Sequence, residues 1–541
     1  MHICFLIGTT QDYAKRVQSL PYFLLVFGTF FIHMTQSTSN SSDSSSLNSA
    51  ERKAAYSLAS IYVLRMLGLF MVIPVIAVSA LSFHDYSPLL VGLAVGGYGL
   101  TQALLQIPFG IASDKWGRKP VIYLGLALFC LGSLIAGFAD SMMMLTIGRI
   151  LQGSGAIAGA VMALAGDVTR ESQRTKVMAI IGVSIGFSFY VALLLGPVLA
   201  ANIGLQGIFM LTAILCIACF PLIKWGVSDA HLSRTATGDS LPKLNQLSRL
   251  FSHHLLWRLN VSVLIIHLLI TCFFVQVPIF LLDIDMPLSE HYKVYGLVLF
   301  ASIGILLILM QVSKSLPIGT AFKLALLLIA GGFCLLISQV PSYWLIVIAG
   351  ILFFGGFNFL EAKMPAMVSS LAPAGQKGSA MGIYASHQFF GAFLGGLISG
   401  LMNSYFDPNT SFIMCLVLIF ICSLLSKGLA STERVKRVTL SYQSGSVHSN
   451  GVQLDSVAVG NSQSTSQSVN HGSGQVNSHS DNASISETDM NDVLQQLKIM
   501  TGVKDVKADM DEHAFYLKVD AATFNLSQAQ ALLQTKPVLS K

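Results

Sequence analysis

Long apolar segments recur through most of this chain of 541 residues. A helix needs about 20 mostly apolar residues to cross the hydrocarbon core of a bilayer. Twelve segments reach that length, and they are centred in residues 55–80, 88–111, 119–138, 142–165, 176–201, 206–225, 256–281, 293–313, 318–338, 342–369, 378–402 and 409–428. The sequence therefore predicts an all-α polytopic membrane protein with twelve transmembrane helices.

The composition argues against several classes of function. Only 11% of the residues are charged, whereas soluble domains carry about 25%. The net charge of +6 comes from basic residues in short loops, so we expect no nucleic acid partner. No GxxxxGK[ST] motif occurs, which argues against a nucleotide-driven pump. Cys216 and Cys219 form a C-x-x-C pair inside an apolar segment. We interpret them as packing residues, and we expect no metal site, no cofactor and no enzyme activity.

The distribution of Lys and Arg orients the predicted helices. These residues accumulate in the cytoplasmic loops of membrane proteins. Every second loop of this chain is rich in them, and the intervening loops contain only Lys293. The basic loops carry Lys115, Arg118, Lys119, Arg170, Arg174, Lys176, Lys224, Arg234, Lys243, Arg249, Lys314, Lys377, Arg434, Lys436 and Arg437. We therefore expect both ends of the helical core on the cytoplasmic side.

The longest polar connection inside the apolar region divides the predicted helices into two sets of six. Two such halves are typical of secondary transporters. We expect an N-terminal half at 54–225, a cytoplasmic linker at 226–255 and a C-terminal half at 256–430. Residues 1–53 form an N-terminal segment that we expect to be disordered. Its apolar run PYFLLVFGTFFI is short for a span, and we hypothesise that translation starts at Met34, so that 1–33 are an upstream extension.

A polar segment and a small module follow the predicted helices. Residues 431–488 are mainly Ser, Asn, Gln, Gly and Val, a composition that cannot bury enough apolar surface to order itself, and we expect a disordered tether. In residues 489–541, DMNDVLQQLKIM predicts a helix, GVKDVKADMD and HAFYLKVD predict a hairpin, and LSQAQALLQ predicts a second helix. The sequence thus predicts a small cytoplasmic α/β domain.

The stretch GIASDKWGRKPVIYLG carries four charges between the second and third predicted helices. It resembles the signature of the major facilitator superfamily, at the family's position, through Gly110, Asp114, Lys115, Gly117, Arg118 and Lys119. The resemblance implies a latch between the two halves. Asp114 docks on the N-terminus of the eleventh helix, where the helix dipole favours an anion, and Arg118 pairs with Asp167 at the end of the fourth helix. Gly110 and Gly117 would allow close approach and a tight turn.

The alternative for these charges is that they only fix the topology, and we keep that interpretation for Lys115 and Lys119. The corresponding stretch of the second half, MQVSKSLPIG, lacks the Asp and the Gly-Arg. The sequence therefore predicts an asymmetric latch that the N-terminal half carries.

Ionisable residues inside predicted spans are costly and mark function. Arg65 and Glu361 lie well inside helices one and ten, which line the central cavity in this superfamily. Burial favours the neutral form of a carboxyl group, so we predict that Glu361 is a proton-coupling or substrate residue, with Asn358 one turn before it on the same face. The alternative is a structural pair of Glu361 with Arg65 or Lys363. We interpret His267 and His387 as polar contacts between helices.

Two further elements resemble motifs of the superfamily. In helix four, an Arg-x-x-Gln-Gly-x-Gly element is formed by Arg149, Gln152, Gly153 and Gly155. It implies that Arg149 assists proton transfer, and the alternative is a buried structural ion pair. In helix five, Gly186, Gly196 and Pro197 resemble the glycine-rich element of antiporters, although Ala192, Ala200 and Ala201 replace expected glycines. Small residues allow close helix approach in either case.

Within the superfamily the chain is most similar to the YajR-type bacterial transporters. The resemblance rests on SIYVLRMLGLFMVIPV in helix one, on GVSIGFSFYVALLLGPVLAA in helix five and on the extra C-terminal domain, which is ferredoxin-like in that family. It implies a monomeric, proton-coupled exporter of small molecules in the bacterial inner membrane. Two alternatives stay open: proton-driven uptake, and a membrane-embedded sensor that signals through a cytoplasmic ligand or partner of residues 489–541.

Overall fold

The computed structural model of the chain describes residues 47–227, 250–337, 342–373, 376–406, 408–427, 435–441, 487–509, 514–520 and 523–535. Several predicted segments therefore lie outside the described residues: 1–46 of the N-terminal segment, 228–249 of the linker and 442–486 of the tether.

The first half consists of α3 (Ser49–Ser79), η1 (Ala80–Ser82), α4 (Pro88–Trp116), α5 (Arg118–Gly137), α6 (Met142–Gly153), α7 (Ala158–Asp167) and α8 (Glu171–Gly226). Serine N-caps start two of these helices, because Ser87 accepts from the Leu90 amide and Ser141 from the Met144 amide. Residues 49–53 already belong to α3, so the prediction of disorder is wrong for them. The reason is Glu51, which is buried in the first turn.

The second half consists of α10 (His254–Asp283), η2 (Leu288–Glu290), α11 (His291–Val312), α12 (Ile318–Leu336), α13 (Tyr343–Leu371), α14 (Lys377–Tyr405) and α15 (Pro408–Leu425). Aromatic residues dominate its apolar core. The rings of Phe273 and Phe353 stack at 4.6 Å, and Phe333 meets Phe353 edge-on at 5.5 Å. Dense packing of this kind makes the helices of a half a rigid unit.

In the described part of the chain, nine segments are long and apolar enough to cross a membrane. One of them, Lys176–Gly226, contains two helices that meet at Gly204, where φ is 71° and ψ is 174°. α14, with 29 residues, and α15, with 18, lie outside the nine. The helical membrane fold agrees with the prediction from sequence, and length and hydropathy together select fewer spans than the twelve apolar segments.

The predicted fourth helix is interrupted. Instead of one helix over 142–165, α6 ends at Gly153 and α7 begins at Ala158. The Gly155 carbonyl in the break accepts a hydrogen bond from Arg65 Nη2 at 2.8 Å, and Tyr62 donates to the Ala158 carbonyl at 2.7 Å. Side chains of α3 therefore supply donors at the break, where a continuous helix would have used backbone amides.

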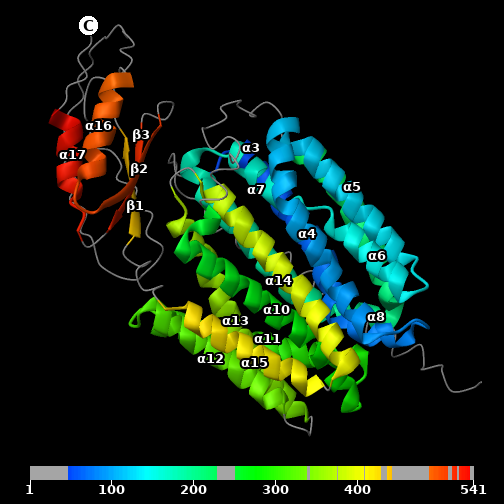
Figure 1. Ribbon diagram of the computed structural model, residues 1–541. Helices are drawn as coiled ribbons and strands as arrows, with labels where there is room; N and C mark the ends of the chain where they lie inside the picture. The colour runs from blue at the N-terminus through cyan, green and yellow to red at the C-terminus, as the bar shows by residue number, and fades with distance from the viewer. Residues whose placement is uncertain are drawn as a thin grey trace, which may run out of the picture. The chain divides into compact units, whose positions relative to one another are not determined.

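Two helices from different halves pack closely. α4 runs beside α14 (Figure 1), and glycines permit the approach: a Cβ atom on Gly92 would lie 2.1 Å from the Gly396 carbonyl oxygen, and one on Gly400 would lie 2.8 Å from the Pro88 carbonyl oxygen. Gly92 and Pro88 belong to the first turns of α4, and residues 110–119 lie at its other end. We call the end of the bundle with residues 110–119 the charged end and the opposite end the far end. The two halves are in close contact at the far end.

The C-terminal module is a three-stranded sheet with two helices. It contains β1 (Val435–Ser441), α16 (Glu487–Ile499), β2 (Val503–Asp509), β3 (Ala514–Asp520) and α17 (Leu526–Thr535). The strand order is β1-β3-β2, and β3 is antiparallel to both neighbours. β1 and β2 are therefore parallel, in a split β-α-β arrangement. Figure 1 shows α16 and α17 on one face of the sheet.

Strand β1 changes the domain boundary that the sequence predicted. Residues 435–441, which we assigned to the tether 431–488, pair with β3 from Val435 opposite Asp520 to Ser441 opposite Ala514. Val438 and Leu440 are each only 4% exposed in the core of the module, and this burial orders a strand that composition alone does not reveal. The polar segment 442–486 thus connects two elements of the module rather than the helical core to the module.

Candidate functional site

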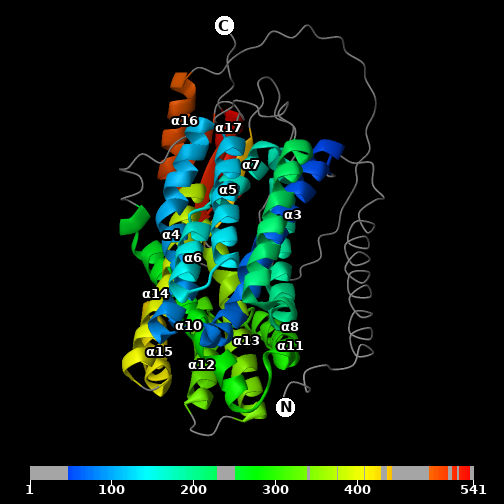
Figure 2. The ribbon, with the colours of Figure 1, turned by 90° about the vertical axis from the view of Figure 1, so that its right-hand side faces the viewer.

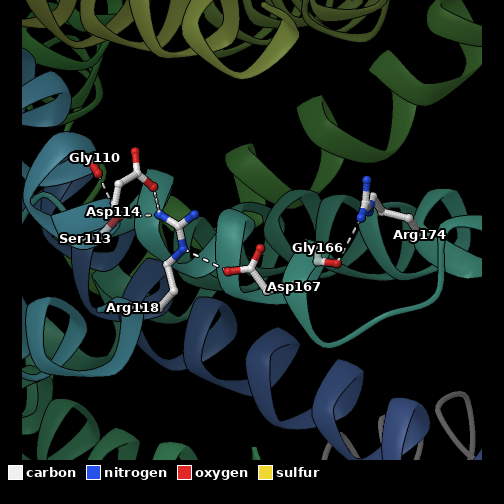
Figure 3. Close-up of polar contacts among 7 residues, drawn as sticks. All are labelled: Gly110, Ser113, Asp114, Arg118, Gly166, Asp167 and Arg174. Carbon is white, nitrogen blue, oxygen red and sulfur yellow. Dashed lines mark hydrogen bonds and ion pairs between the residues drawn. The ribbon is translucent and has the colours of Figure 1, made fainter. Parts of the chain in front are cut away.

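Three of the residues in the predicted latch meet at the charged end (Figure 3). The Arg118 guanidinium lies between two carboxylates: its Nε donates to Asp167 at 2.9 Å and its Nη1 donates to Asp114. Nη1 also donates to Ser113 Oγ at 2.8 Å, and that hydroxyl donates to the Gly110 carbonyl at 2.8 Å. The structure therefore joins the ends of α4, α5 and α7 through one arginine.

The turn between α4 and α5 explains this geometry. Gly117 caps α4 with φ 96° and ψ 152°, a conformation that L side chains rarely adopt. The chain turns within this residue, so that Arg118 starts α5 four positions after Asp114. Both carboxylates lie near helix C-termini and Arg118 at a helix N-terminus, each opposed by its own helix dipole. The ion pairs offset this opposition.

The ion pairs of the cluster are partly open to solvent. The side chains of Arg118, Asp114 and Asp167 are 21%, 28% and 39% exposed. Pairs of this exposure contribute about 0.2–1 kcal/mol each, so the cluster is held weakly enough to rearrange. Nearby, Arg174 Nη2 donates to the Gly166 carbonyl at 3.3 Å (Figure 3), and Lys119 Nζ donates to the Val227 carbonyl at 2.7 Å.

The predicted docking of Asp114 on the eleventh helix is not formed in this structure. Among the described residues, Asp114 bonds only to Arg118. Cβ atoms placed on Gly110, Gly378 and Gly382 would have nothing within 4 Å, so open space adjoins both α4 and the start of α14. The same two helices touch at Gly92 and Gly396, so their described contacts lie toward the far end and not at Gly110, Gly378 or Gly382.

A second ion pair at the charged end was missed by sequence reasoning. Glu51 is 3% exposed and accepts three hydrogen bonds from Arg170: from the amide at 3.0 Å, Nε at 2.8 Å and Nη2 at 2.9 Å. Hydrogen bonding to Glu51 raises the pKa of Arg170. The pair ties the start of α3 to the residue before α8, so the charged end of the first half is internally braced.

Arg65 and Arg149 are buried in the first half. Arg65 Nη2 donates to the Tyr98 hydroxyl at 3.0 Å, Gln102 Oε1 at 3.2 Å and the Gly155 carbonyl at 2.8 Å. Arg149 Nε donates to the Ala94 carbonyl at 3.0 Å and Nη1 to Gln152 Oε1 at 2.5 Å. Both arginines contact Tyr98, since the Arg149 guanidinium lies 5.1 Å from its ring centroid. Their partners in the described structure are all neutral dipoles, and the alternative pairing of Arg65 with Glu361 is not formed.

Glu361 lies in a three-residue cluster of the second half. Its Oε1 accepts from Gln388 Nε2 at 3.0 Å, and its Oε2 lies 3.8 Å from His267 Nε2. Gln388 Nε2 is also 2.7 Å from His267 Nε2. The side chains of Glu361 and His267 are 35% and 14% exposed. Sequence reasoning missed Gln388, because a neutral amide in an apolar helix belongs to no motif; His387 instead bonds to the Ile383 carbonyl of its own helix at 2.8 Å.

Asn358 connects the two halves. Its Nδ2 donates to the Tyr190 hydroxyl of α8 at 2.9 Å and to Ser302 Oγ of α11 at 3.3 Å. Since Glu361 follows Asn358 by one turn, the same face of α13 is directed toward the first half. Glu361 therefore adjoins the space between the halves rather than lipid.

The glycine-rich element of α8 divides into two parts. A Cβ atom on Gly196 would lie 2.3 Å from the Met71 carbonyl oxygen, where α8 runs beside α3 (Figure 2), and Pro197 follows inside the helix. A Cβ atom on Gly186 would have nothing within 4 Å. Gly196 thus serves close packing inside the first half, and Gly186 adjoins open space in this state.

Comparisons with known proteins agree with this architecture. Residues 58–337 and 319–447 match the Major Facilitator Superfamily. The inner membrane transport protein YajR of Escherichia coli K12 is 41% identical over 368 residues, which are 67% of this chain and 80% of that protein. The class B tetracycline resistance protein of Escherichia coli is 31% identical over 153 residues, 27% of this chain and 36% of that protein. A solved bacterial homologue of the human lysosomal transporter Spinster has the same fold, with a TM-score of 0.56, 14% identity and coverage of 72% of this chain and 98% of that one.

Proposed function

Because the chain belongs to the major facilitator superfamily, we propose that it is a proton-coupled secondary transporter that exports a small molecule by alternating access. It is a membrane transporter and not an enzyme. The observation that carries the proposal is Glu361, whose side chain is 35% exposed next to the space between the halves and whose described partners are an imidazole and an amide.

Twelve spans follow if α8 crosses the bilayer twice, with its bend at Gly204, and if α14 and α15 also cross. The basic residues at the charged end favour a cytoplasmic location for that end. The protein then lies in a bacterial inner membrane, as the name of its YajR relative states for that protein. The split β-α-β arrangement and the second helix of the module are consistent with a ferredoxin-like domain.

Alternating access uses the difference between the two ends of the bundle. We take the charged end as the open end of this structure, and closure there brings α14 toward α4, so that Asp114 reaches the start of α14. The dipole interaction and the rearranged ion pairs contribute about 1–3 kcal/mol, which shifts a two-state population about tenfold or more. Opening of the far end then requires separation of Gly92 from Gly396 and of Tyr190 from Asn358.

Proton coupling is assigned to Glu361. A carboxylate in a cavity of low dielectric takes up a proton when water access changes, and the neutral form removes its attraction for a cation. The motif of Arg149 implies that it assists proton transfer, but its enclosure among Ala94, Gln152 and Tyr98 supports a packing role instead. We assign Arg65 and Arg149 to the rigid interior of the first half.

Export rather than uptake is favoured by the partial likeness to a tetracycline resistance protein and to the multidrug resistance protein D of Escherichia coli. A transporter confers resistance most directly by moving the drug out of the cell. The substrate of this chain is a small molecule, with protons as the co-transported ion and the proton gradient as the source of energy.

The test uses the full chain in proteoliposomes with an imposed pH gradient and a pH-sensitive dye inside. Candidate compounds, starting with tetracycline, are screened for proton movement that follows their addition. We expect Glu361→Gln to abolish this movement and Lys363→Gln, two residues further along α13, to retain it. Proton movement at the wild-type rate in Glu361→Gln would contradict the assignment.

A further inference from the structure

The amide of Gln388 binds two partners from two other helices. Its Nε2 lies 2.7 Å from His267 Nε2 of α10 and 3.0 Å from Glu361 Oε1 of α13. An amide nitrogen carries two hydrogens, so both contacts are donated hydrogen bonds. Gln388 on α14 therefore binds α10 and α13 with one atom.

With the Gln388 amide in this orientation, the contacts favour one tautomer of His267. Its Nδ1 lies 3.1 Å from the Val263 carbonyl oxygen, which only accepts, so Nδ1 carries a hydrogen. Nε2 faces the donating Gln388 amide, so Nε2 carries a lone pair. An imidazole with one hydrogen is neutral.

The orientation of the Gln388 amide is also determined by its partners. If the amide were reversed, its oxygen would lie 3.0 Å from Glu361 Oε1, and two acceptors would face each other unless Glu361 carried a proton. In the donating orientation Gln388 bonds both Glu361 Oε1 and His267 Nε2, whereas Glu361 Oε2 is buried and has no hydrogen-bond partner in the described structure. We take this arrangement as that of the cluster without a proton on His267 Nε2.

We propose that Gln388 is the positioning residue that couples proton binding at the His267–Glu361 pair to movement of α14. A proton on His267 Nε2 would place two donors 2.7 Å apart, so the Gln388 contact breaks. The new N–H then turns to Glu361 Oε2, which is 3.8 Å away in this structure, and forms a charge-assisted hydrogen bond. This inference rests on the proposed proton coupling.

Release of Gln388 acts on α14, the helix whose contacts with α4 change between the two states of the proposed transport cycle. α14 packs on α4 at the far end through Gly396 and has open space at Gly378 and Gly382 near its start. Gln388 lies between these regions. When its bonds to α10 and α13 are lost, the charged end of α14 is free to approach α4.

Few other ionisable groups face this pair in the described structure. On α14, Tyr384 interacts electrostatically with Glu361, and His387 is bonded to Ile383 of its own helix. On α13, Lys363 makes no described hydrogen bond or ion pair with the cluster. Glu361 Oε2 is the carboxylate oxygen next to His267, 3.8 Å from its Nε2, so the proposed proton site consists of these two residues.

The test is a pH titration of the purified full chain in lipid nanodiscs, followed by infrared difference spectroscopy. His267→Gln and Glu361→Gln assign the imidazole and carboxyl bands. Gln388→Leu removes the donor that stabilises neutral His267, and we expect the titration midpoint to rise by about one pH unit. Gln276→Leu is the matched control, because Gln276 also bonds α10 to α14, through Asn403 at 2.5 Å, without touching the pair. It should leave the midpoint unchanged.

An unchanged midpoint in Gln388→Leu, or an equal shift in Gln276→Leu, would overturn the proposal. Gln388→Met, which keeps the length of the side chain, replaces Gln388→Leu if the latter does not fold. The titration needs neither substrate nor gradient, so it is independent of the flux assay. If Glu361→Gln abolishes flux but Gln388→Leu leaves the titration midpoint unchanged, the proposed proton coupling stands. Only the proposed role of Gln388 is then removed.

Discussion

The two halves of the bundle differ most at one pair of equivalent turns, which is α4–α5 in the first half and α11–α12 in the second. Between α4 and α5, Arg118 binds Asp114 and Asp167 on two other helices. In the turn between α11 and α12, Lys314 Nζ donates to Gln311 Oε1 in the last turn of α11 at 3.0 Å, its one side-chain bond in the described structure. The arginine that two carboxylates share links three helices, whereas the lysine bonds back to the helix that it follows. This difference agrees with the prediction of an asymmetric latch that the first half carries.

The buried polar groups show the same division. The first half encloses two arginines among neutral dipoles, and the second half holds a carboxylate, an imidazole and an amide next to the space between the halves. Under the proposed function, proton binding therefore belongs to the second half and latching to the first.

The substitution expected to change proton-coupled flux most is Arg118→Lys. Lysine keeps the charge but not the fork that reaches two carboxylates, so we expect proton-coupled flux to fall about tenfold or more. The matched change in the second half, Lys314→Gln, should leave flux within about twofold, because it removes an exposed bond between a turn and the helix before it. Equal losses in both variants, measured in the proteoliposome assay, would remove the asymmetry.

A smaller effect, on thermal stability, is expected to differ between Gly110 and Gly117, the two glycines next to the turn between α4 and α5. Gly117→Ala forces a side chain into φ 96° and should destabilise the protein by about 1–3 kcal/mol. Gly110→Ala has open space and gains helix propensity of up to about 1 kcal/mol, so its Tm should not fall. Flux through Gly110→Ala should still decrease, because closure brings α14 to this surface. A fall in Tm for Gly110→Ala, or none for Gly117→Ala, would contradict this account.

The sequence was most informative where chemistry is local. The contact of Arg118 with Asp114 follows from a spacing of four residues across a glycine turn, and the position of Asp167 follows from the family motif. Helix count and orientation rest on hydropathy and on basic loops, which are also local. These features needed no knowledge of which helices touch.

Other features depend on contacts between distant segments. Gln388 has no charge and no motif, and only the arrangement of α10, α13 and α14 gives it two partners. The break after Gly153 depends on Arg65 reaching the Gly155 carbonyl. Strand β1 depends on pairing with residues about eighty positions later, beyond a long polar segment. Such pairings are properties of the folded chain and leave little trace in a single stretch of sequence.

The most direct test of the latch is a distance measurement at the charged end. Spin labels at Trp116→Cys and Gly378→Cys report the separation of α4 and α14; Trp116 is 69% exposed and a Cβ on Gly378 meets nothing within 4 Å. Cys4, Cys130 and Cys334 are replaced by Ser, and a Tyr86→Cys and Tyr405→Cys pair reports the far end. In the Asp114→Asn background we expect the ratio of short to long distances at the charged end to fall about tenfold, with the opposite change at the far end and no change in Lys115→Gln. An Asp114→Asn distribution identical to that of the wild type would contradict the latch.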